Sequence, residues 1–161
     1  MSKSDNRKKA ESYIIENKNS FYRIAYSYTK NEEDALDVVQ DSIYKALCSI
    51  DTIQDINCIK TWFYKILIRT SIDNIRKNAR YTNLISTELS VDQDRVYDKY
   101  SDIDLIKALE ELPIEYKSIL LLRFFEDLKI DEVAEILDEN INTVKTRLYT
   151  ALKKLKFKVE K

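Results

Sequence analysis

The feature that restricts the interpretation of this 161-residue chain most strongly is the absence of two residue types, glycine and histidine. A Walker loop and a dinucleotide-binding fingerprint both need glycine, because the backbone has to approach phosphate closely. Histidine is the commonest general base and the commonest zinc ligand. These absences argue against an enzyme, a nucleotide-binding protein and a zinc protein, and we expect the chain to use no cofactor.

The scarcity of turn-forming residues predicts the fold class. The chain has a single proline in addition to its lack of glycine, and strand-rich folds need turns that glycine supplies easily. We therefore expect an all-α protein. No run approaches the roughly 20 apolar residues of a membrane-spanning helix, and the first residues lack an apolar signal core. These features predict a soluble, cytoplasmic chain, in which Cys48 and Cys58 are reduced thiols.

Apolar periodicity predicts three helices in the first half of the chain, over residues 7–29, 32–50 and 61–80, with a loop over 51–60. The second of these helices has two contrasting faces. The face expected to lie inward carries Leu36, Val39, Ile43, Ala46, Leu47 and Ile50. The opposite face carries Asp37, Gln40, Asp41, Tyr44 and Cys48. Taken alone, such a polar face indicates an ordinary hydrated helix surface.

A polar segment separates the two halves of the chain. Residues 81–102 are rich in Ser, Thr, Asn and Asp and lack apolar periodicity, which is typical of a linker. The chain then divides into an N-terminal domain (1–80), a linker (81–102) and a C-terminal domain (103–161). We expect two small helical domains joined by a flexible linker.

The C-terminal domain contains a candidate helix-turn-helix. The helical patterns "IDEVAEIL" (130–137) and "INTVKTRLYTALKKLKFKV" (141–159) are separated only by "DEN", and a short helix followed at once by a longer one is typical of this motif. Asn140 is well placed to cap the second helix through its side-chain oxygen. Spacing alone does not distinguish the motif from other helical hairpins.

Charge favours DNA as the target of this second helix. Residues 124–139 are strongly acidic, whereas residues 140–161 are strongly basic. The side chains expected to lie inward are Val144, Leu148, Ala151 and Leu155. The exposed side carries Asn142, Thr143, Lys145, Thr146 and Tyr149, which offer hydrogen-bonding groups to base edges and a cation to phosphates. The alternative is a solvated, lysine-rich helix whose cations complement the helix dipole.

Three segments of the chain carry a family resemblance. They are "DALDVVQDSIYKAL", "KTWFYKILIRTSIDNIRK" and "ALEELPIEYKSILLLRFFEDLKIDEVAEILDENINTVKTRLYTALKKL". In order and spacing, these segments resemble the bacterial extracytoplasmic-function (ECF) sigma factors of RNA polymerase, and the resemblance covers nearly the whole chain. Within the family the chain is most like the sigma-V type, which in related bacteria is held by a membrane anti-sigma factor and released by lysozyme stress.

The resemblance implies a function and a set of partners. It implies an alternative sigma factor that binds core RNA polymerase and directs promoter-specific transcription initiation in a cell-envelope stress response. The implied partners are core polymerase, promoter DNA and a membrane-anchored anti-sigma factor that can hold the protein at the inner face of the membrane, with no small-molecule substrate. Two alternatives remain open: a stand-alone helix-turn-helix regulator that acts without polymerase, and a helical adaptor that never binds nucleic acid.

The resemblance also implies three binding surfaces. The residues implied in core-polymerase binding are Asp37, Gln40, Asp41 and Tyr44. Those implied in minus-ten recognition, beside a 51–60 loop that captures a flipped base, are Lys60, Trp62, Lys65, Arg69, Arg76 and Lys77. Those implied in minus-thirty-five recognition are Asn142, Thr143, Lys145, Thr146, Arg147 and Tyr149. Because aromatic residues at helical spacing are usually core, we also expect Trp62 or Phe63 to be buried.

Three positions depart from the family pattern. Many members have asparagine where this chain has Arg69, a basic residue where it has Thr150, and glycine in the turn where it has Asp138. The first two departures put individual DNA contacts in doubt. Aspartate tolerates the left-handed backbone conformation better than most residues, so we expect the turn to persist.

The length of the linker leads to a further expectation. A linker of about 22 residues spans roughly 25 Å as a random coil. Two promoter elements about 17 base pairs apart lie on the order of 60 Å from each other. The linker must then be drawn out when both domains engage a promoter, and we expect the free protein to bind DNA weakly.

Overall fold

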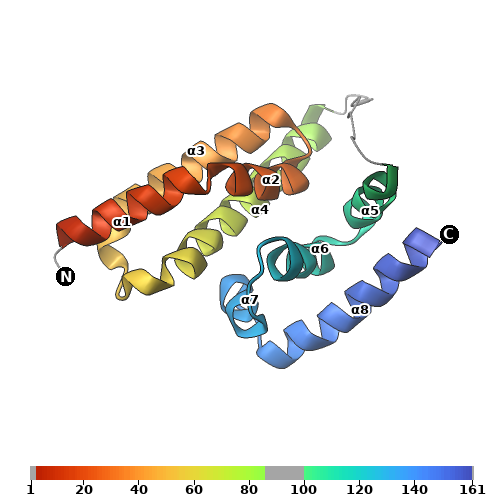
Figure 1. The fold of residues 1–161 in the computed structure, drawn as a ribbon. Helices are drawn as coiled ribbons and strands as arrows, with labels where there is room; N and C mark the ends of the chain where they lie inside the picture. Colours follow the sequence, from red (N-terminus) through yellow and green to blue (C-terminus); the bar gives the residue numbers. More distant parts are fainter. Residues whose placement is uncertain (1–2, 86–99, 161) are drawn as a thin grey trace.

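The computed structural model describes residues 3–85 and 100–160, which form two groups of helices (Figure 1). The first group contains α1 (Lys3–Glu16), α2 (Lys18–Thr29), α3 (Glu32–Cys48), the short turns η1 (Ile50–Thr52) and η2 (Ile56–Cys58), and α4 (Ile59–Ile85). The second contains α5 (Tyr100–Glu111), α6 (Ile114–Leu120), the wide turn η3 (Leu121–Phe125), α7 (Ile130–Leu137) and α8 (Ile141–Glu160). No strand occurs within the described ranges, and the all-α fold class is confirmed.

The predicted helix over residues 7–29 is wrong in one respect, because two helices, α1 and α2, occupy that range and meet at Asn17. The backbone of Asn17 leaves the helical conformation (φ −113°, ψ 16°), and its side-chain amide donates a hydrogen bond to the Tyr13 carbonyl at 2.8 Å. Asparagine can satisfy backbone groups in this way, which competes with the helical ladder. Apolar periodicity continues through the break and therefore conceals it.

The helices also extend into the range predicted as a linker. Helix α4 continues to Ile85 and α5 begins at Tyr100, so residues 81–85 and 100–102 are helical. The rest of the predicted linker, residues 86–99, lies outside the described residues.

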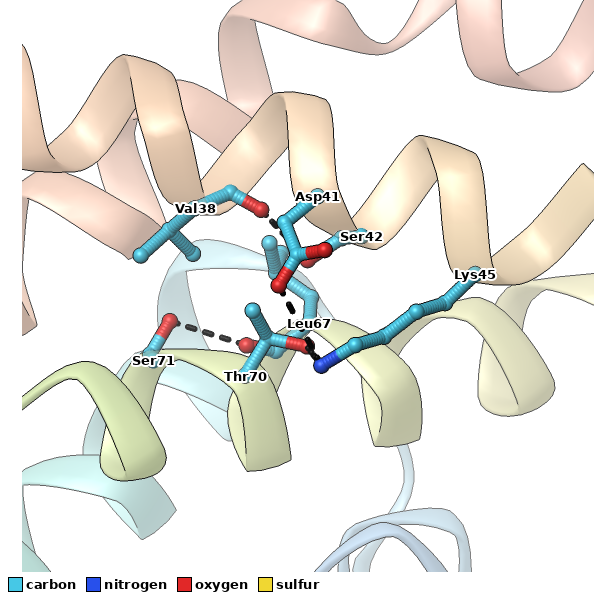
Figure 2. Close-up of polar contacts among 7 residues, drawn as sticks. All are labelled: Val38, Asp41, Ser42, Lys45, Leu67, Thr70 and Ser71. Carbon is cyan, nitrogen blue, oxygen red and sulfur yellow. Dashed lines mark hydrogen bonds and ion pairs between the residues drawn. The ribbon is translucent and has the colours of Figure 1, made fainter.

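Helices α3 and α4 pack side by side through small buried hydroxyls, as Figure 2 shows. Ser42 on α3 and Ser71 on α4 are fully buried. Each hydroxyl donates to a carbonyl one turn earlier in its own helix, that of Val38 at 2.7 Å and that of Leu67 at 2.8 Å. A hydroxyl that is satisfied within its own helix can be buried at little cost. These serines therefore let the two helices approach closely.

The inward face of α3 needs one correction. Its buried residues are Ala35, Val38, Val39, Ser42 and Ala46. Leu36, which the apolar periodicity places inward, is 51% exposed. The buried stripe is rotated toward Ala35 and Val38, so Leu36 shares the solvent face with Gln40 and Tyr44, at spacings of one and two helical turns.

The turn between α7 and α8 confirms the helix-turn-helix and shows how it forms without glycine. Asp138 adopts the left-handed conformation (φ 56°, ψ 46°). Its N–H donates to the Glu135 carbonyl at 3.2 Å, and the Glu139 N–H donates to the Ala134 carbonyl at 2.9 Å, the pattern of a Schellman motif. Asn140 then accepts a hydrogen bond from the Asn142 N–H at 2.8 Å, so the predicted cap is also confirmed.

The main hydrophobic core extends across both of the predicted domains. A small cluster lies within the second group of helices and contains Leu109, Leu112, Leu120 and Ala151. A larger cluster is continuous between the groups: it joins Phe21, Phe63 and Leu67 of the first to Ile119, Leu122, Val133 and Ile136 of the second. The two helical groups are therefore packed against each other, an arrangement that the sequence did not predict.

Candidate functional site

The polar stripe on α3, consisting of Asp37, Gln40, Asp41 and Tyr44 and called the docking stripe below, is exposed along its whole length. Helix α3 begins with an N-cap in which Asn31 accepts a hydrogen bond from the Asp34 N–H at 3.0 Å. Its opposite face is buried against α2 and α4, which fixes the direction of the stripe. Tyr44 is 68% exposed. A large exposed aromatic residue of this kind often anchors a protein interface.

One residue of the docking stripe, Asp41, is linked to α4 indirectly through Lys45. The Lys45 ammonium lies 3.3 Å from the Asp41 carboxylate and donates to the Thr70 hydroxyl on α4 at 3.2 Å (Figure 2). Thr70 is buried, whereas Asp41 and Lys45 are exposed. The charge of Asp41 is thus partly compensated within the chain, and Lys45 links the stripe to the helix behind it.

The cations predicted for minus-ten recognition fall on two different sides of α4. Lys65, Arg69 and Arg76 follow spacings of four and seven residues and so share one face, with Lys77 next to it. The two arginines and Lys77 are exposed, and Lys65 is half-buried. Lys60 is on the opposite side, where its ammonium donates to the Glu126 carbonyl at 3.0 Å. The structure therefore groups four of the five predicted cations and separates Lys60 from them.

The two adjacent aromatic residues of α4 have different surroundings. Phe63 is fully buried and stacks on Phe21 with ring centroids 4.3 Å apart, which confirms that one of the pair is core. Trp62 is half-buried, and it packs against the edge of the same cluster near the side of the grouped cations. Part of the indole remains available for stacking.

The loop that precedes α4 is anchored at two points. Ile50 and Ile56 are buried, and the Asp55 carboxylate caps η2 by accepting from the Asn57 N–H at 3.0 Å. Between and beside these anchors, the exposed residues are Asp51, Thr52, Gln54, Asp55, Asn57 and Cys58. The loop therefore presents polar groups from a fixed backbone.

Helix α8 has the orientation that the sequence predicts. Val144 and Ala151 are fully buried, and Leu148 and Leu155 pack against the core clusters. The opposite side, called the recognition face below, consists of Asn142, Thr143, Lys145, Thr146 and Tyr149. All of these are exposed except Thr143, which is half-buried, and Tyr149 is 74% exposed.

Two further residues of α8 have polar partners within the chain. Arg147 is half-buried, and its guanidinium lies 3.2 Å from the Glu139 carboxylate. Thr150, where many family members have a basic residue, donates its hydroxyl to the Thr146 carbonyl at 3.1 Å. Arg147 therefore already has one partner within the chain.

A buried polar contact that the sequence did not predict lies between the two helical groups. The Tyr64 hydroxyl on α4 donates to the Glu126 carboxylate, which follows η3, and both residues are buried. Burial raises the pKa of Tyr64, and the adjacent carboxylate raises it further. Burial also raises the pKa of Glu126, although the Tyr64 hydrogen bond and the charges of Arg23 and Lys60 oppose this effect.

The described part of the chain offers neither a metal site nor a membrane span. There, no group of three or more His, Cys, Asp or Glu residues is placed to hold a metal ion. None of the helices in those same residues is both long and apolar enough to cross a membrane. Cys48 and Cys58 are exposed free thiols.

Comparisons with known proteins match both halves of the chain. Residues 13–81 match the model of Sigma-70 region 2, and residues 102–155 match that of Sigma-70, region 4. The chain is 51% identical to RNA polymerase sigma factor SigV of Bacillus subtilis, over 92% of this chain and 89% of that protein. It is 28% identical to the ECF RNA polymerase sigma factor SigW of the same organism, over 82% and 79% respectively.

Solved structures share the fold. The sigma factor RpoE from Bartonella quintana, crystallised with the anti-sigma factor NepR, gives a TM-score of 0.81 at 22% identity, covering 93% of this chain and 96% of that one. CnrH, solved with the cytosolic domain of CnrY, gives a TM-score of 0.69 at 18% identity, covering 94% and 87%. The two matched regions in their order, together with the identity to SigV, establish that this chain belongs to the ECF family of RNA polymerase sigma factors.

Proposed function

We propose that this protein is an alternative sigma factor, which binds core RNA polymerase and directs it to start transcription at a specific set of promoters. The observation that carries the proposal is the occurrence of region 2 and region 4 in one chain, in that order, together with 51% identity to SigV over most of both chains. In this proposal the chain recognises the promoter, and polymerase catalyses RNA synthesis.

The docking stripe is the proposed contact with core polymerase. Its carboxylates suit a basic partner surface, because complementary charges speed association and fix the register of an interface. Leu36 and Tyr44 add exposed apolar area beside these charges, and apolar and aromatic groups are typical of the centre of an interface. Leu36, which apolar periodicity places inward, therefore belongs to this proposed surface.

The cation-bearing face of α4 is the proposed contact with the melted minus-ten element. Lys65, Arg69 and Arg76 can follow the phosphates of an opened strand, with Lys77 beside them. The exposed part of Trp62 and the fixed 51–60 loop are suited to stacking against an unpaired base. Lys60 can join this surface only after it leaves the Glu126 carbonyl.

The recognition face of α8 is the proposed contact with the minus-thirty-five element. The helix has a free, polar side that can enter a major groove, where amide and hydroxyl groups such as those of Asn142 and Thr146 read base edges. Lys145 is placed to contact phosphate. Arg147 is a further candidate, whose charge is partly compensated by Glu139.

The proposal includes regulation by a second protein. As the sigma-V resemblance implies, we infer a membrane-anchored anti-sigma factor that holds this protein at the inner face of the membrane until cell-envelope stress releases it. A stand-alone regulator is the competing function, since a helix-turn-helix alone is consistent with it. The match of residues 13–81 to Sigma-70 region 2 favours the sigma factor, because a stand-alone regulator needs only the helix-turn-helix.

A pair of matched tyrosine variants tests the proposal. Tyr44→Ala removes the exposed aromatic from the docking stripe, and Tyr149→Ala removes the one from the recognition face. Because truncating an interface anchor typically costs at least about 2 kcal/mol, Tyr44→Ala should weaken binding to core polymerase roughly 30-fold. Tyr149→Ala should leave core binding unchanged and reduce transcription from the promoter. Each variant serves as the control for the other, and core binding that is insensitive to Tyr44→Ala would refute the assignment.

A further inference from the structure

Helix α1 carries its charges in the reverse of the order that stabilises a helix. Its first half, residues 3–9, contains four cations and one acid, Asp5, whereas the charged residues of its second half are Glu11 and Glu16. The helix dipole favours acids at the N-terminus and cations at the C-terminus. A conflict with local stability is expected mainly at functional positions. The four cations therefore form a candidate binding surface, called the α1 basic surface below: Lys3, Arg7, Lys8 and Lys9.

The α1 basic surface lies close to the 51–60 loop, the proposed site of an unpaired base. Helix α1 packs on both short turns of that loop, η1 and η2, and η2 also contacts α4. Figure 1 shows the N-terminal half of α1 next to the segment that joins α3 to α4. The loop is therefore bordered by two helices that carry exposed cations, α4 with the proposed minus-ten surface and α1.

Two of these cations continue the stripe of α1 that packs on the rest of the protein. Ala10 and Ile14 are buried. Lys3 and Arg7 each precede one of them by seven residues, which places all four on the same side of the helix. Both cations are exposed. The first two turns of α1 therefore extend beyond its buried contacts and present positive charge on the side of those contacts.

The acids of the loop do not neutralise these cations. Asp51 and Asp55 are the exposed acids of the loop. Within the described ranges Lys3 forms no ion pair, and the partner of Arg7 is Glu11 of its own helix, at 3.4 Å. An exposed pair of this kind is weak and exchanges easily. The loop acids would repel the phosphates of a strand that passes over the loop, and cations beside the loop offset this repulsion.

We propose that the α1 basic surface binds phosphates of the single DNA strand whose unpaired base is held by the 51–60 loop. This inference rests on the proposed function as a sigma factor. It extends the DNA contact to residues 3–9, which precede the region 2 match at 13–81. Those residues span roughly 9 Å along the helix axis, the length of about two or three phosphates of one strand. A strand that follows α4 and passes the loop reaches α1 next.

The first test uses the free, full-length chain and needs neither promoter nor polymerase. The probe is a labelled oligothymidylate of about 12 nucleotides, because phosphate contacts do not depend on base sequence. The variant Lys3→Gln/Arg7→Gln removes two cations of the α1 basic surface. The control Lys18→Gln/Lys107→Gln removes two exposed cations from other helices. Because both pairs change the net charge equally, a difference between them reports the position of the charge.

Salt dependence gives the expected result. Each phosphate contact with a single strand contributes about 0.7 to the slope of log affinity against log salt, so Lys3→Gln/Arg7→Gln should lower that slope by about 1.4. The control should keep the wild-type slope, and circular dichroism should show equal helix content in all variants. Glu11→Gln releases Arg7 and should tighten binding about 2-fold. Equal slopes in the two double variants, or no wild-type binding at about 20 mM salt, would overturn the proposal.

The second test uses the complex with core polymerase on a promoter fragment found by transcription of genomic DNA. Lys3→Gln/Arg7→Gln should weaken promoter binding relative to the Lys18→Gln/Lys107→Gln control and leave the affinity for core polymerase unchanged. A loss of core affinity instead would assign the cations to an acidic surface of polymerase and overturn the DNA contact. If the wild-type chain directs no promoter-specific starts, the proposed function fails, and the oligothymidylate measurement still decides whether the α1 basic surface binds phosphate.

Discussion

Asp138 gives the sharpest prediction about how this glycine-free chain builds its helix-turn-helix. Its backbone is left-handed, with φ 56° and ψ 46°, and the two hydrogen bonds that close the turn depend on this conformation. A left-handed conformation costs an ordinary L-residue roughly 1–2 kcal/mol, and aspartate avoids part of this cost. Asp138→Ala should therefore lower the free energy of unfolding by about 1 kcal/mol. Asp138→Val should lower it more, because β-branched residues are rare at positive φ.

Glycine at the same position should be close to neutral. Asp138→Gly relieves the remaining strain, but the more flexible unfolded chain opposes folding by about 0.4–1 kcal/mol. The expected order of stability is therefore glycine or aspartate, then alanine, then valine, measured by urea unfolding followed by circular dichroism. Glu135→Ala on the right-handed, exposed part of α7 is the control and should stay within about 0.5 kcal/mol of wild type. Alanine as stable as aspartate at 138 would refute a left-handed turn.

Three other changes have defined outcomes. Lys145→Ala should weaken promoter binding by the polymerase complex for all sequences and reduce the slope of log affinity against log salt by about 1; an unchanged slope would remove Lys145 from the phosphate contacts. Phe63→Ala should cost about 3–5 kcal/mol in urea unfolding, and a loss below about 1 kcal/mol would contradict its place in the core. Because burial raises the pKa of Glu126, its contribution to stability is fully present below its ordinary pKa and is lost as pH rises through the raised value. Glu126→Gln should therefore gain stability relative to wild type as pH rises above about 4.3, the ordinary pKa of glutamate, and parallel pH profiles would contradict this.

Local signals explain the parts of the fold that the sequence predicted well. The helix-turn-helix, its Asn140 cap and the inward side of α8 depend on residues within a few positions of one another. The pattern at Val144, Leu148 and Ala151 is strong enough to fix the exposed side of that helix. The candidate DNA-binding residues of α8 could therefore be placed on one face, although the pairing of Arg147 with Glu139 could not be foreseen.

Features that depend on local competition or on distant contacts were missed. The break at Asn17 arises from one side-chain hydrogen bond inside a continuous apolar pattern. The exposure of Leu36 reflects a buried stripe that is rotated toward Ala35 and Val38, and this rotation depends on how α3 packs against α2 and α4. Two buried hydrogen bonds between the helical groups join residues 62 and 90 positions apart, and no pattern in a single sequence pairs Tyr64 with Glu126 or Tyr28 with Ser118.

The most direct test of the central claim is transcription in vitro on fragmented genomic DNA from the source bacterium, with core RNA polymerase alone and with this protein added. Sequencing of the transcript starts should reveal discrete new starts only when the protein is present, each preceded by the same pair of upstream elements. The absence of new starts, together with a strong footprint of the free protein on DNA, would contradict the sigma factor and favour the stand-alone regulator.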